Sequence, residues 1–239
     1  MDDLEALGAA LPQIWQGLGI TLLLTVCGAL LAFVLAVGLG LGARAQNVIV
    51  RGASRVVIEF FRGTSLVVQL FFLFFVMPQL GLKLPAILCG IIGLGLNYGA
   101  YGAEVVRGSI NSVPAGQWEA STALSLTRTQ RMWRVIFPQA WALMIPSLNN
   151  LLIQLLKGTA IVGFITLFDL TVALDKLRIA TDTFFFGAVG MVLYFAIAYV
   201  LTLAMNALEV RAKHRLGRGE SLRDALRFRA PVTKGRTAA

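Results

Sequence analysis

The chain has 239 residues, of which 57% are apolar and only 14% are charged, and its mean hydropathy is +0.77. These values lie outside the range of soluble globular domains and predict an integral membrane protein. The length allows about five spans of roughly 20 residues with short connections, so no separate soluble domain is expected. The net charge of +9 fits basic loops at the inner membrane surface better than a nucleic-acid site.

The N-terminal segment, residues 1–17, carries three acidic residues and no Lys or Arg. The basic start of a cleaved signal peptide is therefore missing, and the first apolar run is expected to stay as a span. Apolar runs predict transmembrane helices at residues 18–41, 57–77, 85–106, 139–166 and 184–208. The predicted fold is all-α: a polytopic membrane domain over residues 18–208 with five transmembrane helices, followed by a basic tail over residues 209–239.

The distribution of basic residues predicts the topology. Of the 21 Lys and Arg residues, 17 lie in or beside the two connections after the first and third spans or in the tail, and one of these, Arg62, is just inside the second span. Because basic loops stay in the cytoplasm, the N-terminus is predicted outside the cell and the C-terminus inside. The expected location is a bacterial inner membrane, crossed several times.

Catalytic chemistry finds little support in the sequence. His214 is the single histidine, and Cys27 and Cys89 lie in different apolar runs, so neither a metal site nor a histidine-based catalytic site is predicted. No phosphate-binding Gly-x-x-x-x-Gly-Lys-Ser/Thr motif occurs, so ATP hydrolysis would need another polypeptide. The first span carries Gly28, Gly38, Gly40 and Gly42, a spacing that includes Gly-x-x-x-Gly and permits close helix packing.

The third predicted span contains polar residues at helical spacing. Asn97, Tyr101 and Glu104 lie at i, i+4 and i+7, which places them on one face. Polar groups at membrane depth are costly, so this face should point inward, either lining a substrate passage or forming a hydrogen-bonded seam between helices. For Glu104, an ion pair with Arg107 is the favoured interpretation.

The connection at residues 113–138 is a polar segment between apolar spans. Its chemistry predicts two short helices, the second started by a capping box formed by Thr127 and Gln130. Small residues and one carboxylate share a side of the first helix: Gly116, Glu119, Ala120 and Ala123. They could admit a close partner surface, or they could pack against the chain's own helix ends.

Pro146 predicts an interruption in the fourth span. Asn150, Gln154 and Lys157 share one face of this span at i, i+4 and i+7. A lysine in an apolar run needs an anion, carbonyl groups or water, so Lys157 is a candidate to meet a substrate carboxylate, Glu104 or a partner subunit. We treat the two polar faces together as a hypothetical substrate passage.

The connection at residues 113–138 resembles the EAA loop in permease subunits of ATP-binding-cassette importers. That pattern is Glu-Ala-Ala, three residues, Gly, nine residues, Ile, one residue and Leu-Pro; here Glu119, Ala120 and Ser121 fill the first places and Pro138 the last. Ser125 replaces the usual Gly, at a turn where Gly could adopt φ > 0 and Ser does so reluctantly. The phrases VPAGQWEA, LLKGTAIV and RGTSLVVQLFF are similar to the polar-amino-acid branch, so the resemblance covers about residues 16–210.

The resemblance implies the fold of type I (MetI-like) importer permeases and an ATPase-coupling role for the small-residue face, with Gly116, Glu119, Ala120, Ala123 and Ser125 as its residues. It also implies separate ATPase subunits that bind the ATP, a second permease chain and an external solute-binding protein. This chain itself would need no cofactor. The outer segment, residues 167–183, would lie near the docking surface for the binding protein, unless it is an ordinary solvated loop.

The expected substrate is a polar amino acid or a related zwitterion. The sequences LLKGTAIVGFITLFDLT and RGTSLVVQLFFLFF are most similar to permeases assigned to ectoine and hydroxyectoine. The competing hypothesis is a secondary transporter or channel that works without ATPases. Such proteins usually contain internal repeats and an ion-coupling site, and the sequence shows neither a repeated segment nor two matching broken spans.

Overall fold

The structure is a computed structural model that describes residues 3–180 and 183–215, and the tail beyond residue 215 lies outside the described residues. The described chain is almost entirely helical. Its α-helices are α1 (Asp3–Gly42), α2 (Val48–Gly63), α3 (Leu66–Phe71), α4 (Ala86–Asn111), α5 (Ala115–Ala123), α6 (Arg128–Gln130), α7 (Phe137–Gly158), α8 (Leu170–Ala180) and α9 (Thr183–Arg215). Short π and 3-10 turns cover Phe72–Val76, Met77–Leu80, Arg131–Ile136 and Thr159–Ile165.

The prediction of an all-α membrane domain is confirmed. Within the described residues, Leu7–Gly42, Ala86–Asn111, Arg128–Ile165 and Phe184–His214 are long and apolar enough to cross a membrane. A fifth candidate consists of Val48–Gly63 and Leu66–Leu80, which meet at an angle of 102°. The chain is therefore a multi-pass membrane protein with four or five crossings.

The second predicted span, residues 57–77, is wrong as a single straight helix. Thr64 and Ser65 adopt extended backbone conformations, with ψ of 148° and 135°, and so separate α2 from α3. Hydroxyl side chains compete for nearby backbone groups, which favours such breaks. Here Thr64 Oγ1 donates to the carbonyl oxygen of Phe60 at 2.8 Å. The hydropathy of residues 57–77 gives no indication of this change of direction.

Two other expectations about helix continuity need correction. Pro146 does not interrupt its span, because α7 continues through it from Phe137 to Gly158. Membrane helices tolerate proline when neighbouring groups satisfy the freed backbone atoms. The first helix starts at Asp3, so residues 3–17 of the N-terminal segment, which were expected to precede the first span, belong to α1.

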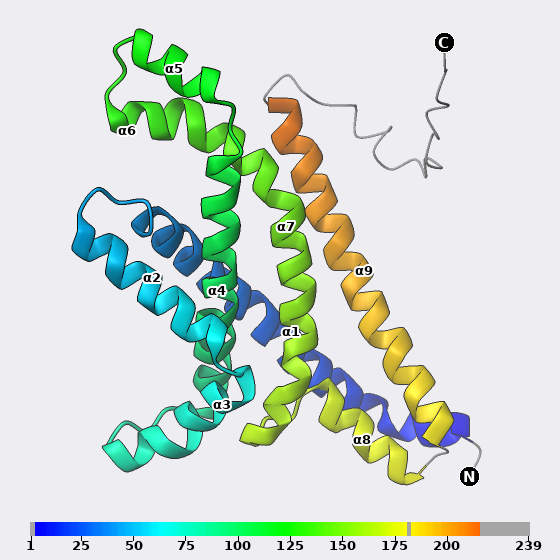
Figure 1. Ribbon diagram of the computed structural model, residues 1–239. Helices are drawn as coiled ribbons and strands as arrows, with labels where there is room; N and C mark the ends of the chain where they lie inside the picture. The colour runs from blue at the N-terminus through cyan, green and yellow to red at the C-terminus, as the bar shows by residue number, and fades with distance from the viewer. Residues whose placement is uncertain (1–2, 181–182, 216–239) are drawn as a thin grey trace, which may run out of the picture.

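The centre of the molecule is the contact between α1 and α4 (Figure 1). Glycines on α4 let the two helices approach: a Cβ atom at Gly99 would lie 2.9 Å from Leu35 Cβ, and one at Gly102 would lie 2.7 Å from Ala36 Cβ. On α1 the close approach falls at Gly40, whose added Cβ would lie 2.8 Å from the Ala103 carbonyl oxygen. Close packing at the glycines of the first span is therefore confirmed at Gly40, whereas Gly38 has open space beside it.

The remaining helices surround this pair unequally. In the most apolar stretch of α4, 56% of the residues are buried, whereas in that of α9 none are. In Figure 1, α4 and α7 run along the middle, α2 lies on one side and α9 on the other, and α5 with α6 extends beyond one end. We call this the α5 end.

Candidate transport pathway and coupling segment

Residues 113–138, which we call the coupling segment after their expected role, lie at the α5 end (Figure 1). The first predicted short helix is α5, whereas the second is not a separate short helix: it starts at Arg128 and continues through Arg131–Ile136 into α7. The capping box is confirmed. Thr127 Oγ1 accepts a hydrogen bond from the Gln130 backbone N–H at 3.3 Å, and Gln130 Oε1 accepts one from the Thr127 N–H at 3.0 Å. These reciprocal bonds satisfy two donors that a helix start leaves open, and they fix where the second helix begins.

The turn after α5 has a left-handed residue at Ser125, with φ of 56°. The Leu126 N–H donates to the Ser121 carbonyl at 3.2 Å and the Ser125 N–H to the Thr122 carbonyl at 2.9 Å, which is the Schellman pattern of a helix end. Glycine usually fills this position because it has no Cβ penalty at positive φ. Ser125 therefore adopts the left-handed conformation that serine takes reluctantly.

The two faces of α5 have different environments. Gly116, Glu119, Ala120 and Ala123 are all exposed. On the other side, Ser121 is buried, and the Gln139 Nε2 amide of α7 donates to Gln117 Oε1 at 3.0 Å. Helix α5 is therefore fastened to the spans along one face and presents a strip of small residues and one carboxylate on the other.

Arg44 is a contributor that the sequence reasoning missed. It follows α1, and its guanidinium donates to Asn111 Oδ1 at the end of α4. The same group lies 5.8 Å from the ring centroid of Trp118 on α5, within cation–π distance. Burial and the nearby Arg107 lower the pKa of Arg44 from its ordinary value. Arg44 thus joins α1, α4 and α5, and its position directly after the first span was the one signal available in the sequence.

The polar face of α4 meets the break between α2 and α3. Asn97 is buried, and its Nδ2 donates to the Phe61 carbonyl at 3.1 Å, while the Tyr101 hydroxyl donates to the Arg62 carbonyl at 3.3 Å. Gln69 donates to the same Phe61 carbonyl at 3.0 Å. A broken helix leaves carbonyls without helical partners, and these side chains supply the donors. Asn97 and Tyr101 therefore form a hydrogen-bonded seam.

Glu104, the third member of that face, is paired within its own helix. Its Oε2 lies 2.5 Å from Arg107 Nη2. The favoured interpretation of Glu104 as an ion-paired residue near the end of the span is confirmed.

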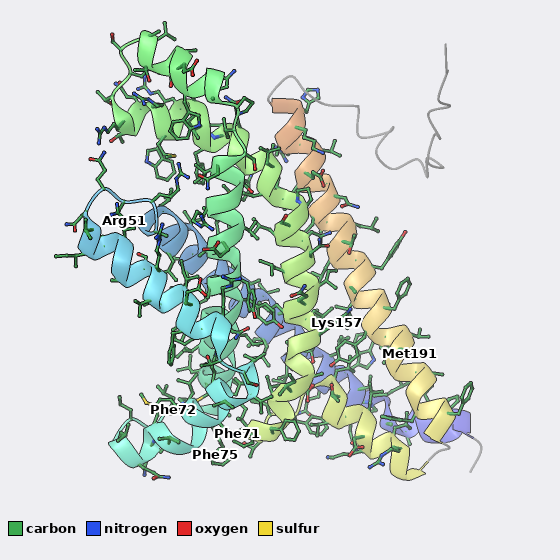
Figure 2. The ribbon with its side chains drawn as sticks, viewed as in Figure 1. Arg51, Phe71, Phe72, Phe75, Lys157 and Met191 are labelled. Atoms are coloured by element: carbon green, nitrogen blue, oxygen red, sulfur yellow. The ribbon has the colours of Figure 1, made fainter. Side chains whose placement is uncertain are left out.

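The polar face of α7 has a different setting. Asn150, Gln154 and Lys157, which we call the α7 stripe, are all exposed (Lys157 is labelled in Figure 2). No carboxylate of the described residues lies within 4.0 Å of the Lys157 ammonium, so the suggested contact with Glu104 is not made. Seam and stripe do not meet: the first faces α2, and the second lies on the surface of the chain.

The outer segment is a helix and not a loop. Asp169 is fully buried and accepts hydrogen bonds from the backbone N–H groups of Thr171 at 3.0 Å and Val172 at 3.3 Å, which caps α8. Burial raises the pKa of Asp169, although these bonds oppose the rise. Asp175 pairs with Arg178 at 2.8 Å on the exposed side. Residues 181–182 of this segment lie outside the described residues.

Comparison with known proteins gives consistent relatives. Residues 28–214 match the family described as binding-protein-dependent transport system inner membrane components. A probable amino-acid ABC transporter permease protein of Sinorhizobium fredii, y4tF, is 42% identical over 216 residues, which are 87% of this chain and 89% of that protein. The L-cystine transport system permease protein TcyB of Bacillus subtilis is 31% identical over 202 residues, 84% of this chain and 86% of that one.

Solved structures show the same fold. The crystal structure of an amino acid ABC transporter with histidines contains a chain that superposes with a TM-score of 0.80 at 30% identity, covering 88% of this chain and 99% of that one. The MetNI methionine ABC transporter in an inward-facing conformation has a TM-score of 0.70 at 19% identity, covering 84% of this chain and 98% of that chain. The type I, MetI-like permease fold predicted from the coupling segment is therefore present. The chain belongs to the family of binding-protein-dependent transport system inner membrane components, the permease subunits of such transporters.

Proposed function

We propose that this chain imports polar amino acids or related zwitterionic solutes, driven by separate ATPase subunits that dock on its coupling segment. The observation that carries the proposal is the division of α5 into a fastened face and an exposed strip. The basic residues beside this segment support a cytoplasmic location for it, with the N-terminus outside. An ATPase bound there would push on α5, and the push would reach α7 through the Gln117–Gln139 bond.

A second permease chain and a passage between the two chains are part of the proposal. Lys157 lies in an apolar span, where an unpaired charge facing lipid costs roughly 2.5 to 3.5 kcal/mol. The α7 stripe is exposed in one chain, so a second copy or a homologous chain would convert it into the wall of a polar passage. A cationic Lys157 beside Asn150 and Gln154 suits a solute that carries a carboxylate and polar groups.

The substrate class rests on this chemistry and on the relatives. The relatives' names refer to amino acids, including L-cystine and, for a protein of Rickettsia bellii, glutamine. Ectoine and hydroxyectoine are zwitterions of the same kind, and the similarity noted in the sequence keeps them in the proposed class. A solute-binding protein outside the cell would deliver the solute near α8, where Asp175, Lys176 and Arg178 are exposed.

Copurification tests the ATPase contact. We expect the ATPase subunit to copurify with the native chain and to be lost with Glu119→Arg combined with Ala123→Trp, because these changes reverse the charge and fill the small-residue strip. Thr129→Trp, an equally bulky change at an exposed position on α6, is the matched control and should keep the ATPase.

Transport in liposomes tests the whole proposal. Uptake should require ATP, the ATPase and the binding protein. Uptake by this chain alone without ATP would contradict the proposal and support a secondary transporter or channel. Retention of the ATPase by the Glu119 and Ala123 double variant would exclude α5 as the docking helix.

A further inference from the structure

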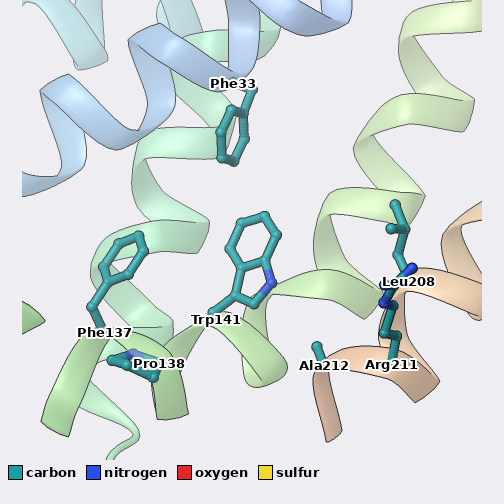
Figure 3. A pocket seen from close by; sticks show the side chains of 7 residues that line it. All are labelled: Phe33, Phe137, Pro138, Trp141, Leu208, Arg211 and Ala212. Carbon is teal, nitrogen blue, oxygen red and sulfur yellow. The ribbon is translucent and has the colours of Figure 1, made fainter. Parts of the chain in front are cut away.

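An apolar crevice separates α9 from α1 and α7 near the α5 end. Figure 3 shows its wider part, a cavity of about 610 Å³ whose wall includes Phe33 from α1, Trp141 from α7 and Leu208 from α9. A second cavity of about 380 Å³ has the same three residues in its wall and extends to Leu201. The two cavities therefore adjoin at these three side chains, and we call them together the α9 crevice.

The dimensions of the crevice fit one leaflet of a membrane. From Arg211 at its open end to Leu201, the crevice follows ten residues of α9, or about 15 Å at 1.5 Å per residue. This length is about half of the roughly 30 Å hydrocarbon thickness of a bilayer. A single acyl chain entering from the α5 end would reach the middle of the membrane.

The charge in the crevice lies at the level expected for a lipid headgroup. Among the described residues that line the two cavities, Arg211 alone carries a charge, and it lies at the outermost position, beside Ala212 and within two turns of the end of α9 (Figure 3). Trp141 lies across from it, and tryptophan favours the interface between headgroups and acyl chains. The crevice thus has an apolar body and a cationic mouth.

The crevice faces away from the α7 stripe. At 100° per residue, the α7 positions that line the crevice, such as Trp141, Leu148 and Leu152, lie about half a turn round the helix from Asn150, Gln154 and Lys157. An aqueous passage or a second permease chain on the stripe would therefore leave the crevice on the lipid side. This placement selects lipid over a second copy as the occupant.

We propose that the α9 crevice binds an anionic phospholipid, with one acyl chain between α9 and the α1–α7 wall and the phosphate at Arg211. The proposal rests on the membrane location of the chain and, for the choice of lipid as occupant, on the passage at the α7 stripe in the proposed function; it does not depend on coupling to ATPases. Basic side chains near the membrane surface attract anionic lipids by about 1 kcal/mol each, which corresponds to a roughly fivefold preference over a zwitterionic lipid.

Quenching of tryptophan fluorescence tests the site. The full chain, with Trp15, Trp118 and Trp133 replaced by Phe, is placed in nanodiscs that contain lipids with brominated acyl chains. We expect brominated phosphatidylglycerol to quench Trp141 at about a fivefold lower mole fraction than brominated phosphatidylcholine with the same chains. Arg211→Gln should remove this preference.

Lys213→Gln is the matched control, because Lys213 lies one residue beyond the crevice wall, with its Nζ held by Glu209 at 2.5 Å. It should keep the preference. Equal quenching by both lipids in the single-tryptophan chain that retains Arg211 would overturn the proposal and indicate ordinary surrounding lipid. Absence of quenching by either lipid would also overturn it, because another copy or the C-terminal tail would then cover Trp141. Circular dichroism and elution volume check that the tryptophan replacements leave the fold intact, and Trp118→Tyr replaces Trp118→Phe if they do not.

Discussion

The polar faces of α4 and α7 have the same spacing in the sequence and opposite settings in the structure. On α4, Asn97 and Tyr101 donate to carbonyls at the break between α2 and α3, and Glu104 pairs with Arg107. On α7, the side chains of the stripe are exposed, and Lys157 has no carboxylate partner among the described residues. The difference teaches that a polar face in a span must find hydrogen-bond partners. Whether those partners come from the same chain depends on whether free backbone carbonyls lie opposite that face.

The first way to break this comparison is to remove the donors at the α2–α3 break. Gln69→Leu deletes bonds to the Phe61 carbonyl at 3.0 Å, the Thr64 carbonyl at 3.3 Å and the Thr64 hydroxyl at 2.7 Å. We expect a loss of about 2 kcal/mol in unfolding free energy, because the lost hydrogen bonds contribute roughly 0.5–1.5 kcal/mol each, while Asn97 still donates to the Phe61 carbonyl. Denaturant unfolding in detergent measures it.

The double variant Gln69→Leu with Asn97→Leu sharpens the same test, because both amides donate to Phe61. Either donor alone still satisfies that carbonyl, so the double variant should lose more than the sum of the two single losses. Additivity within about 0.5 kcal/mol would show that the carbonyl does not depend on the pair.

The second test concerns the stripe. Lys157→Met should lower uptake by the assembled transporter at least about tenfold, since a hydrogen bond to a charged group contributes roughly 1.5–3 kcal/mol. Its unfolding free energy should change by less than about 0.5 kcal/mol, as for other exposed positions. Unchanged uptake with normal assembly would remove the stripe from the passage, while a large loss of stability would show that Lys157 has a partner in the fold.

The third test carries the comparison to α5, which also has a fastened and an exposed face. Ser125→Gly should raise the unfolding free energy by about 1 kcal/mol, because glycine adopts the observed φ of 56° without a Cβ penalty. Thermal unfolding of the purified chain measures the gain, with Ser112→Gly at the right-handed end of α4 as a control expected to show none. A loss of stability in Ser125→Gly would contradict the assignment of strain to this turn.

The smallest effect is expected at Glu104. Its partner Arg107 is 38% exposed, and half-exposed ion pairs contribute less than about 1 kcal/mol. Glu104→Gln should therefore change stability by only a few tenths of a kcal/mol. A loss above 2 kcal/mol would place Glu104 with Asn97 in the supporting seam.

Local chemistry was predictable from the sequence, and long-range geometry was not. The capping box at Thr127 and the Glu104–Arg107 pair depend on residues within a few positions of one another, so their spacing was enough. The break at Thr64 was missed because hydropathy averages over a window and does not respond to two extended residues. The partners of Asn97 were missed because periodicity gives an angle on one helix and says nothing of what lies across from it.

The tight contact between α1 and α4 has a mechanical consequence. With added Cβ atoms at Gly99 and Gly102 only 2.9 and 2.7 Å from α1 side chains, the two backbones interlock, and sliding one past the other would drive Leu35 and Ala36 into residues that have side chains. Helices α1 and α4 are therefore expected to move together as one rigid body. Any change of access across the membrane then has to come from helices that move relative to the α1–α4 pair. Helix α5 lies at one end of this pair, where Arg44 joins it to α1 and α4 (Figure 1).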